Sequence, residues 1–253
     1  MIIDTHCHLH FKDFDADREA VLDRALKAGV ERMVIVGTDP DTNAQAARLA
    51  DQHTQMVCSA GLHPHSAHEF SKEQIDAIGQ SLSDKVVAIG EIGLDYFKSE
   101  APPEIQKKVF AQMIQLALSK NLPVIVHSRN AFDDTFAMIK SEGQGRLRGV
   151  MHCYSYGKDE LSKVLDQGFV ASFACNITYK SAAALLDVAV TAPLDRIVIE
   201  TDAPYLSPQN LRGQRNESAN LRGLVEFLSA KRGITPQEFE ETTTQNAKRL
   251  FVL

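Results

Sequence analysis

The sequence predicts one closed α/β barrel of the (β/α)8, or TIM-barrel, type. Three observations predict it: short runs rich in Val and Ile recur eight times, segments with helical spacing separate them, and the chain has 253 residues. Alternating strands and amphipathic helices are typical of a parallel sheet, and about 250 residues is a usual barrel length. An open doubly wound sheet is the alternative, but no Gly-x-Gly-x-x-Gly sequence follows the first run, which disfavours a Rossmann fold.

The expected elements are bounded by polar residues or by Gly and Pro. We expect strands at 1–6, 33–37, 55–61, 86–92, 122–128, 149–154, 169–174 and 196–202. We expect helices at 16–28, 41–53, 72–82, 104–120, 131–142, 158–167, 181–191, 218–231 and 236–250. Pro103 lies near the start of one helix and Gly143 near the end of another, where these residues are common. No Gly/Ser-rich linker interrupts the series, so we expect a single domain over residues 1–253.

Composition excludes several classes of protein. No apolar run approaches the roughly 20 residues that span a bilayer, and the first residues lack the pattern of a secretory signal, so we expect a cytoplasmic protein with no membrane contact. Four scattered cysteines, none in Cys-x-x-Cys spacing, argue against a zinc ribbon or a disulfide framework. The net charge of −6 opposes any general attraction for nucleic acid, so a polyanion needs a local basic site or metal ions.

Metal-ligand side chains follow the expected strands where each strand ends. In a barrel these ends form the face that carries the active site. His6 and His8 are two residues apart on a strand and so share a face, while Cys7 points away from it. The candidate ligands at these ends are His6, His8, His63, His65, Glu91, His127, His152 and Asp202.

Burying the candidate ligands together costs free energy unless a cation lies between them. A single histidine at a strand end is more often a structural residue, but several imidazoles and carboxylates buried at one barrel mouth need a compensating charge. Six of these eight residues already exceed one tetrahedral site, so we expect two metals: one near His6, His8 and Asp202, and one near His127 and His152. Glu91 is then the natural bridge. Two divalent cations that activate water indicate a hydrolase.

The chain resembles a known family over nearly its whole length. The motifs that carry the resemblance are Asp4-Thr5-His6-Cys7-His8, Gly61-Leu62-His63-Pro64, Gly90-Glu91-Ile92-Gly93-Leu94-Asp95-Tyr96, Pro123-Val124-Ile125-Val126-His127-Ser128-Arg129, Met151-His152-Cys153-Tyr154, Glu200-Thr201-Asp202-Ala203-Pro204-Tyr205-Leu206 and Arg215-Asn216-Glu217. In order and spacing they are similar to the TatD-type metal-dependent nucleases, a branch of the amidohydrolase-like metal barrels. Ser218 departs from the pattern, because proline is common there, and Cys175-Asn176 replaces a usual glycine.

The resemblance implies a TIM-barrel deoxyribonuclease that binds up to two divalent cations, Mg²⁺, Mn²⁺ or Zn²⁺. It implies a 3′-5′ exonuclease on single-stranded DNA, with RNA as a further candidate substrate. It implies that the metal ligands are His6, His8, Glu91, His127, His152 and Asp202. It also implies that Asp202 is the base that orients the attacking water and that His63 lies on the substrate side.

Substrate contacts are expected on the loops that follow the strands. Phosphate is expected near the basic residues Arg129, Lys180, Arg212 and Arg215, with Glu217 in the same motif as the last of these. Bases are expected to stack on Tyr96, Tyr154 or Tyr205, although these rings could equally pack the barrel rim. No helix-turn-helix or zinc finger is evident, so we expect little sequence specificity and no obligate protein partner.

Two other functions stay open at this point. The first is a related barrel hydrolase that cleaves an ester or amide, such as the aminoacyl bond of a mischarged tRNA. Many amide-cleaving relatives use a carbamylated lysine as the bridge on strand four, where this chain has Glu91. The second is a non-enzymatic scaffold on the same barrel, which would require lost ligands, and none is missing.

Overall fold

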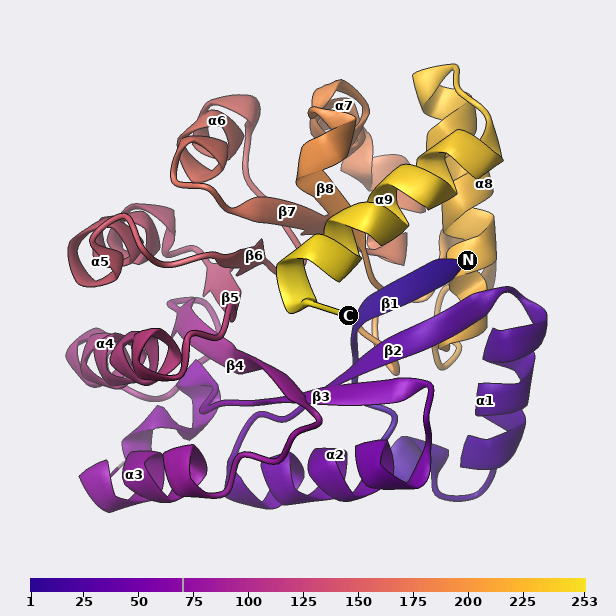
Figure 1. Cartoon of the computed structure of the whole chain (residues 1–253). Coiled ribbons are helices and arrows are strands. Elements are labelled where there is room, and N and C mark those ends of the chain that lie inside the picture. The colour runs from indigo at the N-terminus through magenta and orange to yellow at the C-terminus, as the bar shows by residue number, and fades with distance from the viewer. Residues whose placement is uncertain (70) are drawn as a thin grey trace.

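Eight parallel strands form the barrel in a computed structural model that describes residues 1–69 and 71–253. Each strand pairs with the next along the chain (Figure 1). Backbone bonds from Asp202 N to His6 O (2.9 Å) and from His8 N to Ala203 O (2.7 Å) join the segment after the last strand to the end of the first. The predicted TIM barrel is therefore confirmed. The strands are β1 Ile2–Cys7, β2 Val30–Val36, β3 Met56–Ala60, β4 Val86–Asp95, β5 Val124–Arg129, β6 Gly149–Met151, β7 Val170–Phe173 and β8 Ile197–Ile199.

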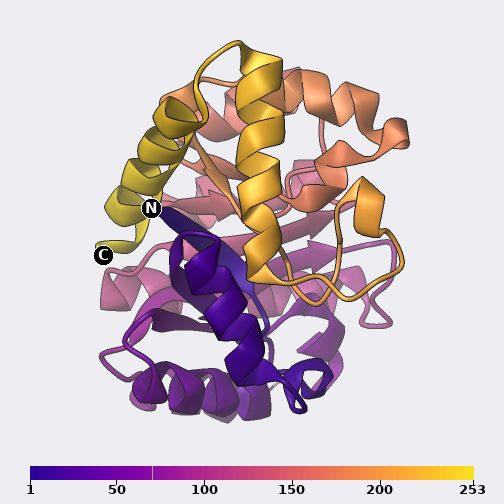
Figure 2. The same cartoon turned by 90° about the vertical axis from the view of Figure 1, so that its right-hand side faces the viewer.

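Helices surround the strands, and a last helix covers one end of the barrel. The helices of the described residues are α1 Arg18–Lys27, α2 Pro40–Gln52, α3 Lys72–Gln80, α4 Pro103–Lys120, α5 Phe132–Gly143, α6 Lys158–Asp166, α7 Ala183–Thr191, α8 Leu221–Arg232 and α9 Pro236–Phe251. Figure 2 shows α9 and both termini at the same end. Ala247, Leu250 and Phe251 of α9 pack with the inward side chains of the strands, so α9 seals the end where the strands begin.

Local sequence signals account for several helix starts. Asp39 accepts a hydrogen bond from Thr42 N (2.9 Å) at the start of α2, and Ser71 accepts one from Gln74 N (3.3 Å) at the start of α3. Both are capping boxes, which satisfy backbone N–H groups that the helix leaves unpaired. Thr235 caps α9 in the same way, through Glu238 N (3.1 Å). These short-range contacts explain why the predicted helices lie within a few residues of the observed ones.

Strands β6 and β8 are shorter than predicted. They end at Met151 and Ile199, whereas the apolar runs favoured 154 and 202. The backbone leaves the extended conformation just beyond them, with φ of 43° at Cys153 and 55° at Asp202. His152 and Asp202 therefore lie on the turns that follow the strands, at the mouth of the barrel.

Two sequence features of the loops have clear structural outcomes. Ser218 is the first residue of a 3-10 turn, Ser218–Asn220, and its buried hydroxyl caps no helix; α8 starts only at Leu221. The cysteines Cys7, Cys58, Cys153 and Cys175 are all free, as their spacing predicts. No helix in the described ranges is both long and apolar enough to cross a bilayer.

Candidate metal centre

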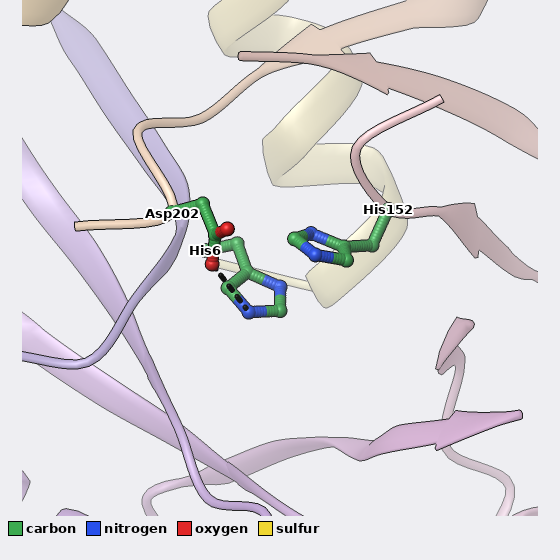
Figure 3. A group of neighbouring side chains, drawn as sticks. All are labelled: His6, His152 and Asp202. Atoms are coloured by element: carbon green, nitrogen blue, oxygen red, sulfur yellow. Dashed lines mark ion pairs between the residues drawn. The ribbon is translucent and has the colours of Figure 1, made fainter. Parts of the chain in front are cut away.

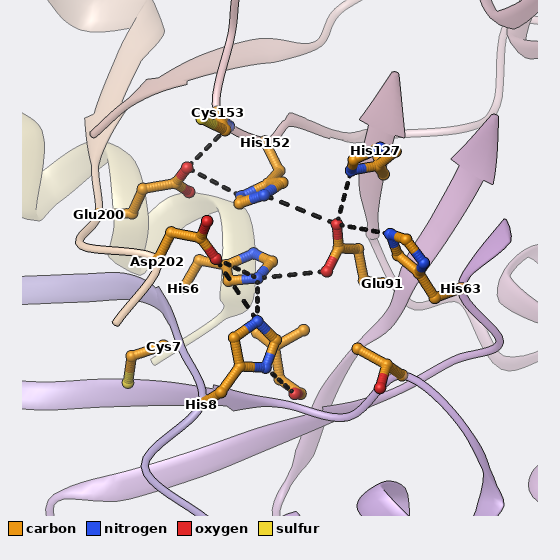
Figure 4. A network of polar contacts seen from close by, with 12 residues as sticks. His6, Cys7, His8, His63, Glu91, His127, His152, Cys153, Glu200 and Asp202 are labelled. Carbon is orange, nitrogen blue, oxygen red and sulfur yellow. Dashed lines mark hydrogen bonds and ion pairs between the residues drawn. The ribbon is translucent and has the colours of Figure 1, made fainter. Parts of the chain in front are cut away.

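All six predicted metal ligands meet at the open end of the barrel (Figure 4). They come from five strands that are spread along the sequence, and each is largely buried. Glu91 lies inside β4, which continues to Asp95, and the others lie near or just beyond the end of their strand. In the first group, the Nε2 atoms of His6 and His8 lie 3.1 Å apart. Asp202 Oδ1 is 3.7 Å from His6 Nε2 and 3.5 Å from His8 Nε2, while Glu91 Oε2 is 3.4 Å from His6 Nε2.

The first group has the donor chemistry of a cation site. His8 Nδ1 lies 2.7 Å from the carbonyl oxygen of Val36, to which it donates its proton. The Nε2 atom of neutral His8 therefore directs a lone pair toward His6 and Asp202. Buried lone pairs and carboxylate oxygens that converge at these distances repel one another unless a cation or a proton lies between them.

The second group surrounds the other oxygen of Glu91. His127 Nδ1 lies 2.9 Å from Glu91 Oε1, and His152 Nε2 lies 3.6 Å from the same atom. Glu91 thus directs Oε2 to one imidazole set and Oε1 to another, which is the arrangement of a bridging carboxylate. Figure 3 shows that His152 also lies beside His6 and Asp202, with its ring 3.6 Å from that of His6. His152 is therefore within reach of both groups.

Two carboxylates outside the predicted set orient the histidines of the second group. Asp95 Oδ2 lies 3.1 Å from His127 Nε2, and Glu200 Oε1 lies 2.8 Å from His152 Nδ1. Each carboxylate holds one ring nitrogen, so that the other nitrogen faces Glu91. Both residues belong to the motifs noted above, but no sequence signal pairs them with histidines on other strands.

Glycine allows the neighbouring strands to close around Glu91. A Cβ atom added at Gly61 would lie 2.5 Å from the carbonyl carbon of Gly90, beside the backbone of Glu91. At Gly93, where φ is 139°, an added Cβ would lie 1.9 Å from the carbonyl oxygen of His127. Larger residues would therefore push β3 and β5 away from β4 and separate the ligands that they carry.

His63 is close to the centre, but its ring proton lies on the nitrogen that faces Glu91, unlike that of His8. The backbone N–H of His65 donates to His63 Nδ1 (3.1 Å), so the proton of the neutral ring lies on Nε2. His63 Nε2 is 3.4 Å from Glu91 Oε1. Burial lowers the pKa of His63 to about 4, so the ring is neutral at pH 7. This tautomer makes Nε2–H a hydrogen-bond donor and disfavours ligation through Nε2.

The charges of the centre are mutually dependent. Burial alone would raise the pKa of Glu91, but His63 and His152 hold it well below its usual value. Burial alone would lower the pKa of His152, but Glu200 and Glu91 raise it to about 10. The pKa of His127 is raised against its burial by Asp95 and Glu91. Without a cation, protons on these two histidines compensate the buried carboxylates.

We therefore expect metal binding to strengthen with pH. A cation requires an unprotonated ring nitrogen, and the pKa of His152 near 10 means that this proton must be displaced throughout the neutral range. Between pH 6 and 8 the apparent affinity of the metal-free protein for Mn²⁺ should rise by up to about tenfold per pH unit for each displaced proton. Titration calorimetry in two buffers of different ionisation enthalpy measures the protons released.

The control for this experiment is a histidine far from the centre. His53, half-buried near Glu19, should be replaceable by glutamine without effect on proton release, whereas His152→Gln should reduce it. Mn²⁺ binding that releases no protons and does not vary with pH would contradict the proposed ligand role of His152.

A cavity of ≈ 440 Å³ opens above the centre. Three predicted substrate residues, His63, Arg129 and Tyr205, line it, together with Lys98 and His65. The Tyr205 side chain is 54% exposed, so its ring is available to a ligand. The residues around the cavity thus combine cations and an aromatic ring at the rim with acidic groups at the base.

The other predicted substrate residues have partners elsewhere. The Tyr96 hydroxyl donates to Asp134 Oδ2 (2.7 Å), and Tyr96 does not line the cavity. Arg215 forms two hydrogen bonds with Asp17 (2.8 Å each), and Glu217 pairs with Arg24 (2.6 Å). These ion pairs tie the loop after β8 to Asp17, just before α1, and to Arg24 in its last turn. A direct substrate contact for these three residues stays a prediction that their side-chain bonds disfavour.

Three further residues named from the sequence also lie outside the cavity lining. Tyr154 is buried, and its hydroxyl donates to Gly157 O (2.7 Å), so this ring packs the barrel rim. The guanidinium of Arg212 covers the ring of Tyr179 at 4.8 Å. Lys180 is exposed at the start of a short 3-10 turn.

Comparison with known proteins decides the family. The model of the family described as "TatD related DNase" matches residues 3–252. The chain belongs to this TatD family. A Bacillus subtilis relative named "Uncharacterized metal-dependent hydrolase YabD" is 38% identical over 252 residues, 99% of each chain. A Rahnella relative named "3'-5' ssDNA/RNA exonuclease TatD" is 34% identical, covering 97% of this chain and 96% of its own.

Solved structures agree with this assignment. The crystal structure of YJJV, described as a TatD homologue from Escherichia coli K12, superposes with a TM-score of 0.94 and 31% identity, covering 100% of this chain and 98% of its own. The protein is thus a metal-dependent hydrolase of the TatD family. The resemblance inferred from the motifs is confirmed.

Proposed function

We propose that this TatD-family hydrolase is a 3′-5′ exonuclease that cleaves phosphodiester bonds in single-stranded DNA, and also RNA, at a two-metal site. The observation that carries the proposal is the orientation of Glu91, whose Oε2 faces His6 while its Oε1 faces His127 and His152. Paired divalent cations in such a site are suited to phosphoryl chemistry. The name of the Rahnella relative supports the polarity and the single-stranded substrate.

The side chains of the centre have different roles in hydrolysis. Two divalent cations would supply Lewis acidity and a nucleophilic water at neutral pH. His6, His8 and Asp202 would hold one of them, and His127 and His152 the other, with Glu91 shared. The pKa of Asp202 is held below its usual value by His8 and His152, against its burial, so its carboxylate is ionised and can accept a proton from water. His63 Nε2–H can donate a hydrogen bond to a phosphoryl oxygen.

The ligand set also limits the choice of metal. Four imidazoles favour Zn²⁺ or Mn²⁺, while the two carboxylates also admit Mg²⁺. A carboxylate in place of a carbamylated lysine on β4 favours phosphodiester over amide substrates. Arg129 and Lys98 at the cavity rim would hold the phosphates next to the scissile bond.

The test is a substrate panel with each cation. Single-stranded oligonucleotides labelled at the 5′ end should shorten progressively from the 3′ end in Mn²⁺ or Mg²⁺, and EDTA should abolish the reaction. Duplexes with blunt ends and aminoacyl-tRNA should react far more slowly. Full activity in EDTA would overturn the metal mechanism, and preferential release of the amino acid from aminoacyl-tRNA would establish the ester-cleaving alternative.

A further inference from the structure

Phe97 presents an exposed aromatic ring beside Arg129, a residue that lines the cavity. It follows β4 directly, and its side chain is 62% exposed, more than any other aromatic side chain among the exposed large hydrophobic residues of the described ranges. The guanidinium carbon of Arg129 lies 4.2 Å from the ring centroid, within the range of a cation–π contact. Arg129 itself lines the cavity, so the ring and the metal centre are connected through one side chain.

The backbone of Phe97 is anchored to the metal centre. The N–H groups of Phe97 and Lys98 donate to Asp95 Oδ1, at 2.9 and 2.7 Å. The other oxygen of Asp95 holds His127. The loop that carries the ring therefore shares one buried carboxylate with a predicted metal ligand, which fixes the position of the ring relative to the centre.

Two basic residues line the cavity on the side of this loop, Arg129 and Lys98. Arg129 and Lys98 form no ion pair with a carboxylate within residues 1–69 and 71–253, whereas Arg24, Arg215 and Arg222 all do. The chain carries a net charge of −6, so a carboxylate partner would be easy to supply. One such cation against an exposed ring, and a second on the lining of the same cavity, match a ligand with both phosphates and flat apolar rings.

We infer that Phe97 and Arg129 form a nucleotide subsite, in which a base of a single strand stacks on the open face of Phe97 while Arg129 pairs with the adjacent phosphate. Every base has a π face, so such a subsite tolerates any sequence. A base within a duplex is already stacked and paired, so the subsite selects single strands. The inference rests on the proposed exonuclease function and names the residues that recognise its substrate.

Phe97→Ala tests the stacking. With a single-stranded oligonucleotide in Mn²⁺, the variant should raise KM by about 5- to 150-fold, the range expected for one lost base–aromatic stack. Phe97→Trp should retain the wild-type KM. With an oligonucleotide whose 3′-terminal residues are abasic, wild type and Phe97→Ala should have similar KM values, because no base is present to stack. Arg129→Ala should weaken binding of both substrates, whereas Arg146→Ala, an exposed arginine before β6, should affect neither.

The outcomes distinguish failure of the proposed stacking subsite from failure of the proposed exonuclease activity. A penalty for Phe97→Ala that is equally large on the abasic oligonucleotide, or no penalty on either, would overturn the stacking. If the wild-type protein cleaves no oligonucleotide, the proposed function fails, and fluorescence anisotropy of the same two oligonucleotides then decides the subsite. Weaker binding by Phe97→Ala of the base-containing strand alone would support it, and equal binding would overturn it.

Discussion

Glu91→Gln is expected to reduce phosphodiester hydrolysis by on the order of 1000-fold or more, since the Lewis acidity of paired cations is worth several kcal/mol. Glutamine keeps the size of the side chain but removes the charge that both histidine groups face. Glu91 Oε1 is 2.9 Å from His127 Nδ1 and Oε2 is 3.4 Å from His6 Nε2, so both proposed metal positions lose their shared anion. Metal analysis after dialysis against Mn²⁺ should show fewer cations per chain than in the wild type.

The control for Glu91→Gln is a glutamate far from the metal centre. Glu31 is exposed at the start of β2, so Glu31→Gln changes the net charge by the same amount without touching the centre. It should keep wild-type activity and Mn²⁺ stoichiometry. If Glu91→Gln retained both cations and most of the activity, Glu91 would not be the bridge.

Asp202→Asn is expected to lower kcat by about 100- to 10,000-fold, the usual contribution of a general base. The amide cannot accept the proton of the attacking water, although its oxygen can remain near His6 and His8. The loss should appear in kcat more than in KM, because Asp202 lies at the base of the cavity and the substrate-binding cations lie at its rim. Steady-state kinetics on a single-stranded oligonucleotide measures the changes in kcat and KM separately.

His63→Ala provides the contrast for Asp202→Asn. The hydrogen bond from His65 N to His63 Nδ1 leaves the proton on Nε2, so His63 should contribute to activity without holding a cation. The variant should therefore lose activity while it keeps the Mn²⁺ stoichiometry of the wild type. Loss of one cation in His63→Ala would contradict the tautomer argument and make His63 a ligand.

The barrel and the candidate ligands can be predicted from the amino-acid sequence. Alternating apolar runs and helical segments predict eight βα units, because the period of a strand or helix depends on neighbours within the same element. The rule that barrel sites lie at the ends of strands then selects His6, His8, Glu91, His127 and Asp202 from local position alone. The pattern does not define every strand end: β6 and β8 end three residues earlier than the apolar runs predict.

The tertiary structure alone decided how those side chains are oriented and which neighbours they have. That Asp95 holds His127, and that Glu91 divides its oxygens between two groups, depends on strand register and side-chain rotamers, which no local pattern encodes. Packing also decides the orientation of the two aromatic side chains after β4. Tyr96 turns to Asp134, while Phe97, the next residue, faces outward beside Arg129. Local periodicity places a residue on a strand, but only packing between strands determines what its side chain contacts.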